Sequence, residues 1–120
     1  MARVDWFRVG LLSLALAVAL GAFGAHGLQS LVSEARLETW HTAVRYQVWI
    51  SLALVAIASW RGDIAASAFW CLSLGMVVFS GSLYALVLLD FPRLGAITPL
   101  GGVLLISGLG WAAYSAKDSS

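Results

Sequence analysis

The chain is poor in charged residues, histidine and cysteine, and each shortage excludes a class of function. Only 11% of the 120 residues are charged and the net charge is +1, so we expect no nucleic-acid partner. The single cysteine, Cys71, excludes an intrachain disulfide and a cysteine metal site. The usual motifs of hydrolases, metalloproteases and nucleotide-binding enzymes are also missing. We therefore expect no enzyme activity and no cofactor.

The chain is rich in apolar residues. Hydrophobic residues make up 61% of the chain and the mean hydropathy is +0.90. A soluble domain of this length could not bury so much apolar surface. We predict an all-α integral membrane protein, a single domain over residues 1–120. Four runs of about 20 residues are each long enough to cross a bilayer as a helix. They are approximately 5–25, 40–60, 64–89 and 94–114.

The connections between these runs predict how the helices are arranged. Two of them are very short, RGD at 61–63 and DFPR at 90–93, so neighbouring helices should be antiparallel. The connection at 27–39 is longer and carries apolar residues at helical spacing: Leu28, Leu31, Val32 and Ala35. This pattern favours a short amphipathic helix in the membrane interface, with a solvated loop as the alternative.

The N-terminal run is similar to a secretory signal, but its apolar part is longer than usual, so we predict a retained first helix. Positive charges on the side of both termini outnumber those on the other side by four to three. They are Arg3, Arg8, Arg61 and Lys117 against Arg36, Arg45 and Arg93. This difference predicts cytoplasmic termini.

Tryptophans mark the expected span ends. Trp6, Trp40, Trp60 and Trp111 fall near the predicted membrane interfaces, where tryptophan is enriched. Trp49 falls in the middle of its span, where it is either a packing residue or a contact with another subunit.

Most of the polar and glycine-rich sequence inside the spans falls near one membrane face. This polar and glycine-rich sequence lies at the end of the first and third apolar runs and at the start of the second and fourth. We predict a structural or interaction cluster there, made of Gly21, Gly24, His26, His41, Arg45, Tyr46, Gln47, Ser80, Ser82, Tyr84, Thr98, Gly101 and Gly102. Small residues in spans favour close helix packing over a ligand groove.

Arg45 is the costliest member of this cluster, because a charge inside a span is penalised. Either its side chain extends to the interface, or it points inward and is held by Tyr84, Ser80 or first-helix carbonyls. Glu38 and Asp90 are acidic residues within its expected reach.

The two histidines, His26 and His41, are predicted near the same face. A zinc site takes three or four protein ligands, and no third histidine exists, so a metal or haem site is disfavoured. Each imidazole is expected to cap a helix end or to hydrogen-bond a neighbouring helix. Gln47 needs an interhelical partner if it is buried.

Four motifs in this order resemble one family: LGAFGAHGL, TAVRYQ, FSGSLY and ITPLGG. The chain is similar to the small bacterial membrane proteins of domain of unknown function 423, related to eukaryotic transmembrane protein 256. The resemblance covers roughly residues 10–113. It implies a four-helix protein of the bacterial inner membrane and supplies no catalytic residue. Members usually carry a histidine four residues after the tyrosine of the YQ pair, where this chain has Ile50.

These features favour an accessory or assembly subunit that packs through its small-residue helix faces, in a larger membrane complex or in a homo-oligomer. One alternative is an oligomeric small-solute or ion pathway with Arg45, Gln47 and Tyr84 at its mouth. Another is a lipid- or quinone-binding protein in which Arg45 and Trp40 hold a headgroup. Membrane lipids are expected partners in every case.

Overall fold

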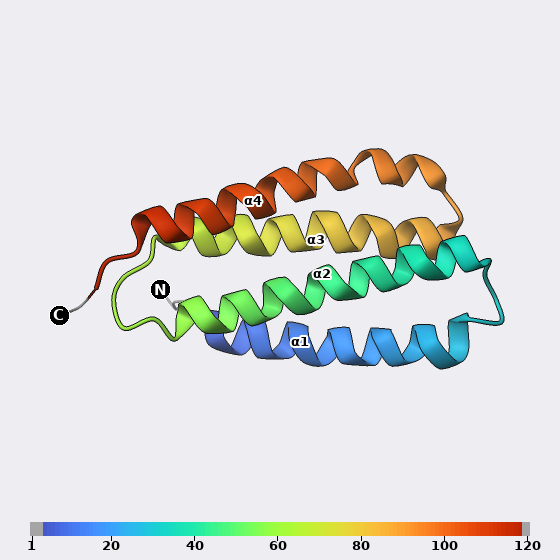
Figure 1. Ribbon diagram of the computed structural model, residues 1–120, viewed down its shortest axis with the longest axis horizontal. Coiled ribbons are helices and arrows are strands. Elements are labelled where there is room, and N and C mark those ends of the chain that lie inside the picture. Colours follow the sequence, from blue (N-terminus) through green and yellow to red (C-terminus); the bar gives the residue numbers. More distant parts are fainter. Residues whose placement is uncertain (1–3, 119–120) are drawn as a thin grey trace.

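The computed structural model describes residues 4–118 and contains four long helices (Figure 1). They are α1 (Trp6–Phe23), α2 (Glu34–Ala58), α3 (Ala66–Leu89) and α4 (Thr98–Ser115). A π-helix, η1 (Gly24–Leu28), continues α1, and a 3-10 helix, η2 (Pro92–Ala96), precedes α4. Within residues 4–118 the only strand-like pairing is one isolated bridge, Asp63–Lys117. The prediction of an all-helical protein is confirmed.

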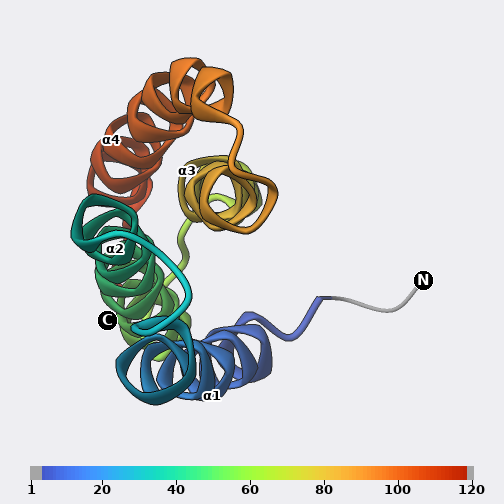
Figure 2. The same ribbon diagram turned by 90° about the vertical axis from the view of Figure 1, so that its right-hand side faces the viewer.

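Consecutive helices lie side by side in an open row. α1 packs on α2, α2 on α3, and α3 on α4. Seen from one end, α1 and α4 lie at opposite edges of the molecule (Figure 2). Residues 24–33 and 90–97 form one end, called here the Asp90 end, and residues 59–65 form the other (Figure 1). The open row leaves grooves between helices that are not consecutive in the chain.

Among the described residues, three segments are long and apolar enough to cross a membrane: Trp6–Leu28, Ala66–Leu89 and Pro92–Ser115. They match three of the four predicted spans. α2 has comparable length but is more polar, since it carries His41, Arg45 and Gln47. Membrane crossing by α2 therefore stays a prediction.

The segment 27–39 does not form the separate amphipathic helix that its apolar spacing predicts. Its first residues complete η1, residues 29–33 form turns, and α2 begins at Glu34. Ser33 caps α2, because its Oγ accepts a hydrogen bond from the Arg36 backbone N–H at 3.2 Å. Glu34 in the first turn also favours a helix start here. The apolar side chain of Leu28 consequently folds onto the core and is buried.

The apolar core has two parts. One, toward residues 59–65, joins α2, α3 and α4 and consists of Ile50, Leu54, Phe69, Leu72, Met76 and Leu105. The other, toward the Asp90 end, consists of Leu28, Trp40, Leu86 and Val87. Glycines bring α3 and α4 together: a Cβ at Gly108 would lie 2.8 Å from Leu72 Cγ, and one at Gly75 would lie 2.9 Å from Leu105 Cδ2. Close packing by small residues is thus realised between these helices.

Candidate functional site

A buried amide, Gln47 of α2, joins three helices. Its side chain is 5% exposed. The Nε2 atom donates to the backbone carbonyl of Ser13 in α1 at 2.9 Å, and Oε1 accepts from the Tyr84 hydroxyl of α3 at 2.7 Å. This arrangement supplies the interhelical partners that a buried glutamine needs where hydrocarbon offers none.

Serine hydroxyls extend this network through the bundle. The Ser51 Oγ donates to the Ser13 Oγ at 2.7 Å, which links α2 and α1 again. The Ser80 Oγ donates to the Ala43 carbonyl at 2.7 Å and so links α3 to α2. Ser51 and Ser80 are both buried. Gln47, Ser51 and Ser80 therefore all find partners inside the bundle, as in a structural network, whereas the buried Ser73 Oγ makes no hydrogen bond within residues 4–118.

Trp40 locks the α1–α2 junction at the Asp90 end. It is 1% exposed, and its indole Nε1 donates to the Leu20 carbonyl at 2.8 Å. Its ring packs edge-on against Phe23 and Tyr84, with centroid distances of 5.8 and 4.7 Å. A Cβ at Gly24 would lie 2.6 Å from the Trp40 ring, so the lack of a side chain at Gly24 leaves the space that this ring fills. This space is called here the slot. Because it is buried here, the Trp40 ring does not face outward as a belt residue would, and its position near the membrane interface stays a prediction.

A second group of predicted residues lies at the α3–α4 junction. The hydroxyls of Ser82 and Thr98 share a 2.6 Å hydrogen bond. A Cβ at Gly101 would lie 2.5 Å from the Phe79 backbone nitrogen, whereas one at Gly102 would come no closer than 3.8 Å to the Phe79 ring. Tyr46 also lies on this side of α2, with its ring 4.1 Å from that of Phe79.

The Arg45 side chain is exposed and does not take the inward alternative. Its Nη1 lies 3.1 Å from Glu38 Oε1, and both side chains are more than half exposed. It makes no hydrogen bond to Tyr84 or Ser80, which are occupied by Gln47 and Ala43. A pair this exposed contributes little stability where it meets water.

The two histidines differ in their exposure. His26 is exposed at the end of α1, and His41 is half-buried beside Gly24. Across residues 4–118 no group of three or more histidine, cysteine or acidic side chains is placed to hold a metal ion.

The thirteen predicted cluster residues thus belong to several separate contacts. Gly21 approaches Val44 and Gly24 approaches Trp40 between α1 and α2. Gln47, Ser80 and Tyr84 belong to the central network, and His26 and Arg45 are exposed. Sequence reasoning did not place Ser13 or Ser51 in the network. A signal for Ser13 was present, because Ser13, Ala17 and Gly21 recur at intervals of four along one face of the first helix.

The Gln47–Tyr84 hydrogen bond is expected to couple α2 and α3 energetically. Tyr84→Phe should lower the free energy of unfolding by about 1 kcal/mol. Gln47→Leu should lower it by about 1–3 kcal/mol, because a buried hydroxyl and a carbonyl lose their partner. The double variant should lose less than the sum, as measured by a double-mutant cycle in bicelles.

Tyr46→Phe is the matched control for this cycle, since the Tyr46 ring packs on Phe79 and its hydroxyl makes no hydrogen bond within residues 4–118. It should change the free energy of unfolding by less than about 0.5 kcal/mol. Strict additivity of Gln47→Leu and Tyr84→Phe would contradict the coupling.

The part of the chain that contains these contacts is similar to a known family. The profile of a family described as "Protein of unknown function (DUF423)" matches residues 20–102. The chain belongs to the DUF423 family. The matched residues contain Trp40, Gln47 and Tyr84, together with the Asp90 end. The resemblance inferred from the four motifs is thereby confirmed.

Relatives of this DUF423 chain are bacterial membrane proteins. A UPF0382 membrane protein of Staphylococcus aureus (strain bovine RF122 / ET3-1) is 45% identical over 106 residues, covering 86% of this chain and 85% of the relative. The UPF0382 membrane protein YwdK of Bacillus subtilis (strain 168) is 43% identical over 103 residues, covering 82% and 84%. No solved structure matches the chain. The DUF423 chain is a membrane protein.

Proposed function

We propose that this protein is an accessory or assembly subunit whose four helices cross the bacterial inner membrane in alternating directions, with both termini cytoplasmic. In this proposal, it docks through the groove between α2 and α4 onto a transmembrane helix of another subunit or of a second copy. The observation that carries the proposal is the exposure of Trp49 in the middle of α2.

The groove between α2 and α4 has a volume of about 320 Å³ and is lined almost entirely by apolar side chains. Trp49, with its ring 4.9 Å from Tyr46, stands at the groove. Exposed leucine and valine alone would suit contact with lipid as well as contact with protein. They do not distinguish contact with lipid from contact with protein, whereas the indole of Trp49 does.

Trp49 is 54% exposed, and its indole N–H has no acceptor within residues 4–118. It lies about 14 Å along the helix from Trp40 and about 14 Å from Ala58, the last residue of α2, at 1.5 Å per residue. With α2 crossing the bilayer, this position is far from both interfaces, where tryptophan is normally enriched. A polar N–H in hydrocarbon is costly without a partner. A docked helix would supply both ring contact and an acceptor.

An oligomeric pathway lined by Arg45, Gln47 and Tyr84 has less support. Arg45 lies on the exposed side with Glu38, whereas Gln47 and Tyr84 bond each other inside the bundle. The three side chains therefore do not share one opening.

The proposal is tested by native mass measurement of the protein in nanodiscs prepared directly from membranes. We expect the wild type to be an oligomer or to carry a second membrane subunit. Trp49→Ala should weaken this association about tenfold or more, the effect of losing a central aromatic contact. Val18→Ala, at an exposed apolar position of α1, is the control and should leave the association unchanged. A wild type that is a monodisperse monomer with no co-purifying protein would contradict the proposal.

A further inference from the structure

We infer that the Asp90 end binds a phospholipid with a phosphoethanolamine headgroup. The headgroup would lie on the Arg36–Asp90 ion pair, and one acyl chain would follow the groove between α1 and α3. This site is separate from the α2–α4 groove and does not depend on the subunit proposed above.

The headgroup site is a groove of about 790 Å³ between the start of α2 and the end of α3. Its apolar lining consists of Leu28, Leu31, Val32, Ala35, Val87 and Leu88, and its polar lining of Ser33, Arg36 and Asp90. The volume is within the usual range for small-molecule sites. Apolar walls beneath a charged pair, at the end of a membrane bundle, match an amphiphile better than a wholly polar ligand.

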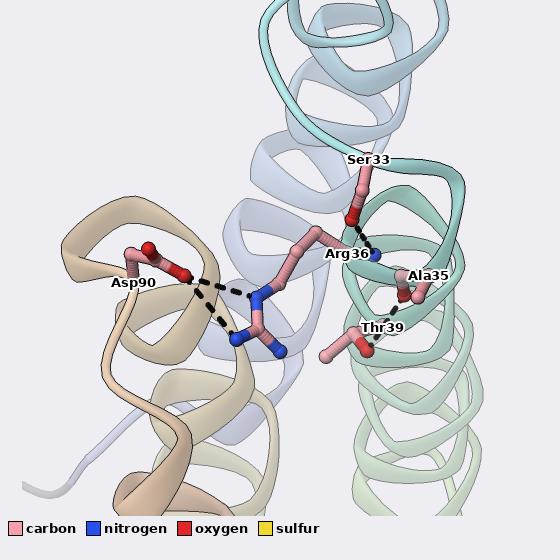
Figure 3. A network of polar contacts seen from close by, with 5 residues as sticks. All are labelled: Ser33, Ala35, Arg36, Thr39 and Asp90. Atoms are coloured by element: carbon pink, nitrogen blue, oxygen red, sulfur yellow. Dashed lines mark hydrogen bonds and ion pairs between the residues drawn. The ribbon is translucent and has the colours of Figure 1, made fainter.

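The ion pair presents both charges to a ligand. Arg36 donates from Nε and Nη2 to the same oxygen, Asp90 Oδ1, at 3.3 and 3.2 Å (Figure 3). Arg36 Nη1 and Asp90 Oδ2 make no other hydrogen bond within residues 4–118. The Asp90 side chain is 83% exposed, and that of Arg36 is 29% exposed.

This arrangement selects among headgroups by charge. A phosphate can accept from Arg36, and a primary ammonium can donate to Asp90. A phosphoglycerol headgroup offers Asp90 only neutral hydroxyl donors, so its negative phosphate is not balanced by a cation beside this carboxylate. A choline headgroup carries a cation but no N–H donor. Among these three headgroups, only phosphoethanolamine offers both a phosphate for Arg36 and a cation with N–H donors for Asp90.

The backbone holds Asp90 in place for this role. It is the C-cap of α3 and has a left-handed backbone conformation, with φ of 50°. The chain then turns, with the Phe91 N–H donating to the Leu86 carbonyl at 3.1 Å. The carboxylate is thereby directed toward α2 and Arg36 (Figure 3).

An acyl path leads away from the headgroup site along α3. Val77, Gly81, Tyr84 and Leu88 are spaced by four, three and four residues, so they lie on one face of the helix. Leu88 lines the headgroup groove, and the other three line a second groove of about 370 Å³ together with Leu12 and Leu16 of α1. Figure 2 shows α1 and α3 on the same side of α2.

Gly81 keeps this path open. A Cβ at Gly81 would meet no atom within 4 Å. The face from Leu88 to Val77 is about 17 Å long at 1.5 Å per residue, enough for most of an extended acyl chain. A single lipid can therefore contact both grooves.

The test is native mass spectrometry of the protein in nanodiscs containing equal amounts of phosphatidylethanolamine, phosphatidylglycerol and phosphatidylcholine. The wild type should retain one phosphatidylethanolamine at least tenfold more often than either other lipid. Asp90→Asn should reduce this preference at least tenfold while keeping the fold, since asparagine tolerates the left-handed conformation. Arg36→Gln should weaken retention of all three lipids.

The acyl path is tested by Gly81→Leu, whose side chain would fill the groove without meeting neighbouring atoms at its Cβ. Gly110→Leu in α4, another glycine with no atom within 4 Å of its Cβ position, is the matched control. Gly81→Leu should lose at least tenfold in lipid retention, and Gly110→Leu should keep it. Trp49→Ala should also keep it, which separates this site from the subunit interface. No retained lipid on the wild type, preference for phosphatidylglycerol, or unchanged binding in Asp90→Asn and Gly81→Leu would each overturn the inference.

Discussion

Gly101→Ala is expected to lower the free energy of unfolding by about 2–3 kcal/mol. The added Cβ would lie 2.5 Å from the Phe79 backbone nitrogen and 2.8 Å from its Cα. These are backbone atoms within α3, so no side-chain rotation relieves the clash, and α3 and α4 must move apart. The higher helix propensity of alanine, about 1 kcal/mol, offsets only part of this loss. Reversible unfolding in bicelles measures the difference.

Two glycines of the same helix serve as controls. A Cβ at Gly102 would lie at ordinary contact distance, 3.8 Å from the Phe79 ring, and one at Gly110 would meet nothing within 4 Å. Gly102→Ala and Gly110→Ala should therefore be neutral or stabilise by up to about 1 kcal/mol. Equal losses in all three variants would mean that α4 disfavours alanine generally, and that the Gly101–Phe79 approach is not responsible.

Helix positions were largely predictable from the apolar runs. The predicted spans 5–25 and 64–89 differ from α1 and α3 by at most two residues at each end. These runs are bounded by charged residues or turns, and their length alone requires a helix in a bilayer. The start of α2 was missed, because the Ser33 cap extends the helix through residues that look amphipathic in isolation.

The faces of α2 were less predictable. The sequence left Arg45 two orientations, and geometry decides between them because Glu38, seven residues earlier, lies on the same exposed side. Gln47 and Tyr46 are adjacent in sequence but contact different neighbours. Gln47 hydrogen-bonds Ser13 and Tyr84, whereas the Tyr46 ring packs on Phe79. Such assignments depend on how three helices cross, which no single segment encodes.

The burial of the two α2 tryptophans was also not predictable from the helix alone. Trp40 was expected at the membrane interface, yet it is the more deeply buried of the two, because Gly24 of another helix leaves space for its ring. Trp49 was left as either a packing residue or a contact with another subunit, and it is exposed beside an apolar groove. Span-end position alone therefore does not separate a belt tryptophan from a core one.

Trp40→Ala is expected to lower the free energy of unfolding by about 3–5 kcal/mol, the usual cost of deleting a buried large aromatic side chain. Within residues 4–118, Trp40 of α2 is the largest side chain that is almost fully buried, and it contacts both α1 and α3. Its removal would open a cavity and leave the Leu20 carbonyl without the indole donor. Unfolding in bicelles gives the loss.

Trp40→Phe separates the two causes of that loss, since it keeps an aromatic ring in the slot beside Gly24 but removes the indole N–H. We expect it to cost about 1–2 kcal/mol, comparable to one hydrogen bond plus imperfect packing. If Trp40→Phe costs as much as Trp40→Ala, the hydrogen bond to Leu20 dominates the junction and the cavity contributes little. If neither variant is destabilised, the α1–α2 junction is not held by Trp40 and the glycine slot has another role. We expect the free energy of unfolding to be lowest for Trp40→Ala, higher for Trp40→Phe and highest for the wild type. This order requires both the ring and the N–H to contribute.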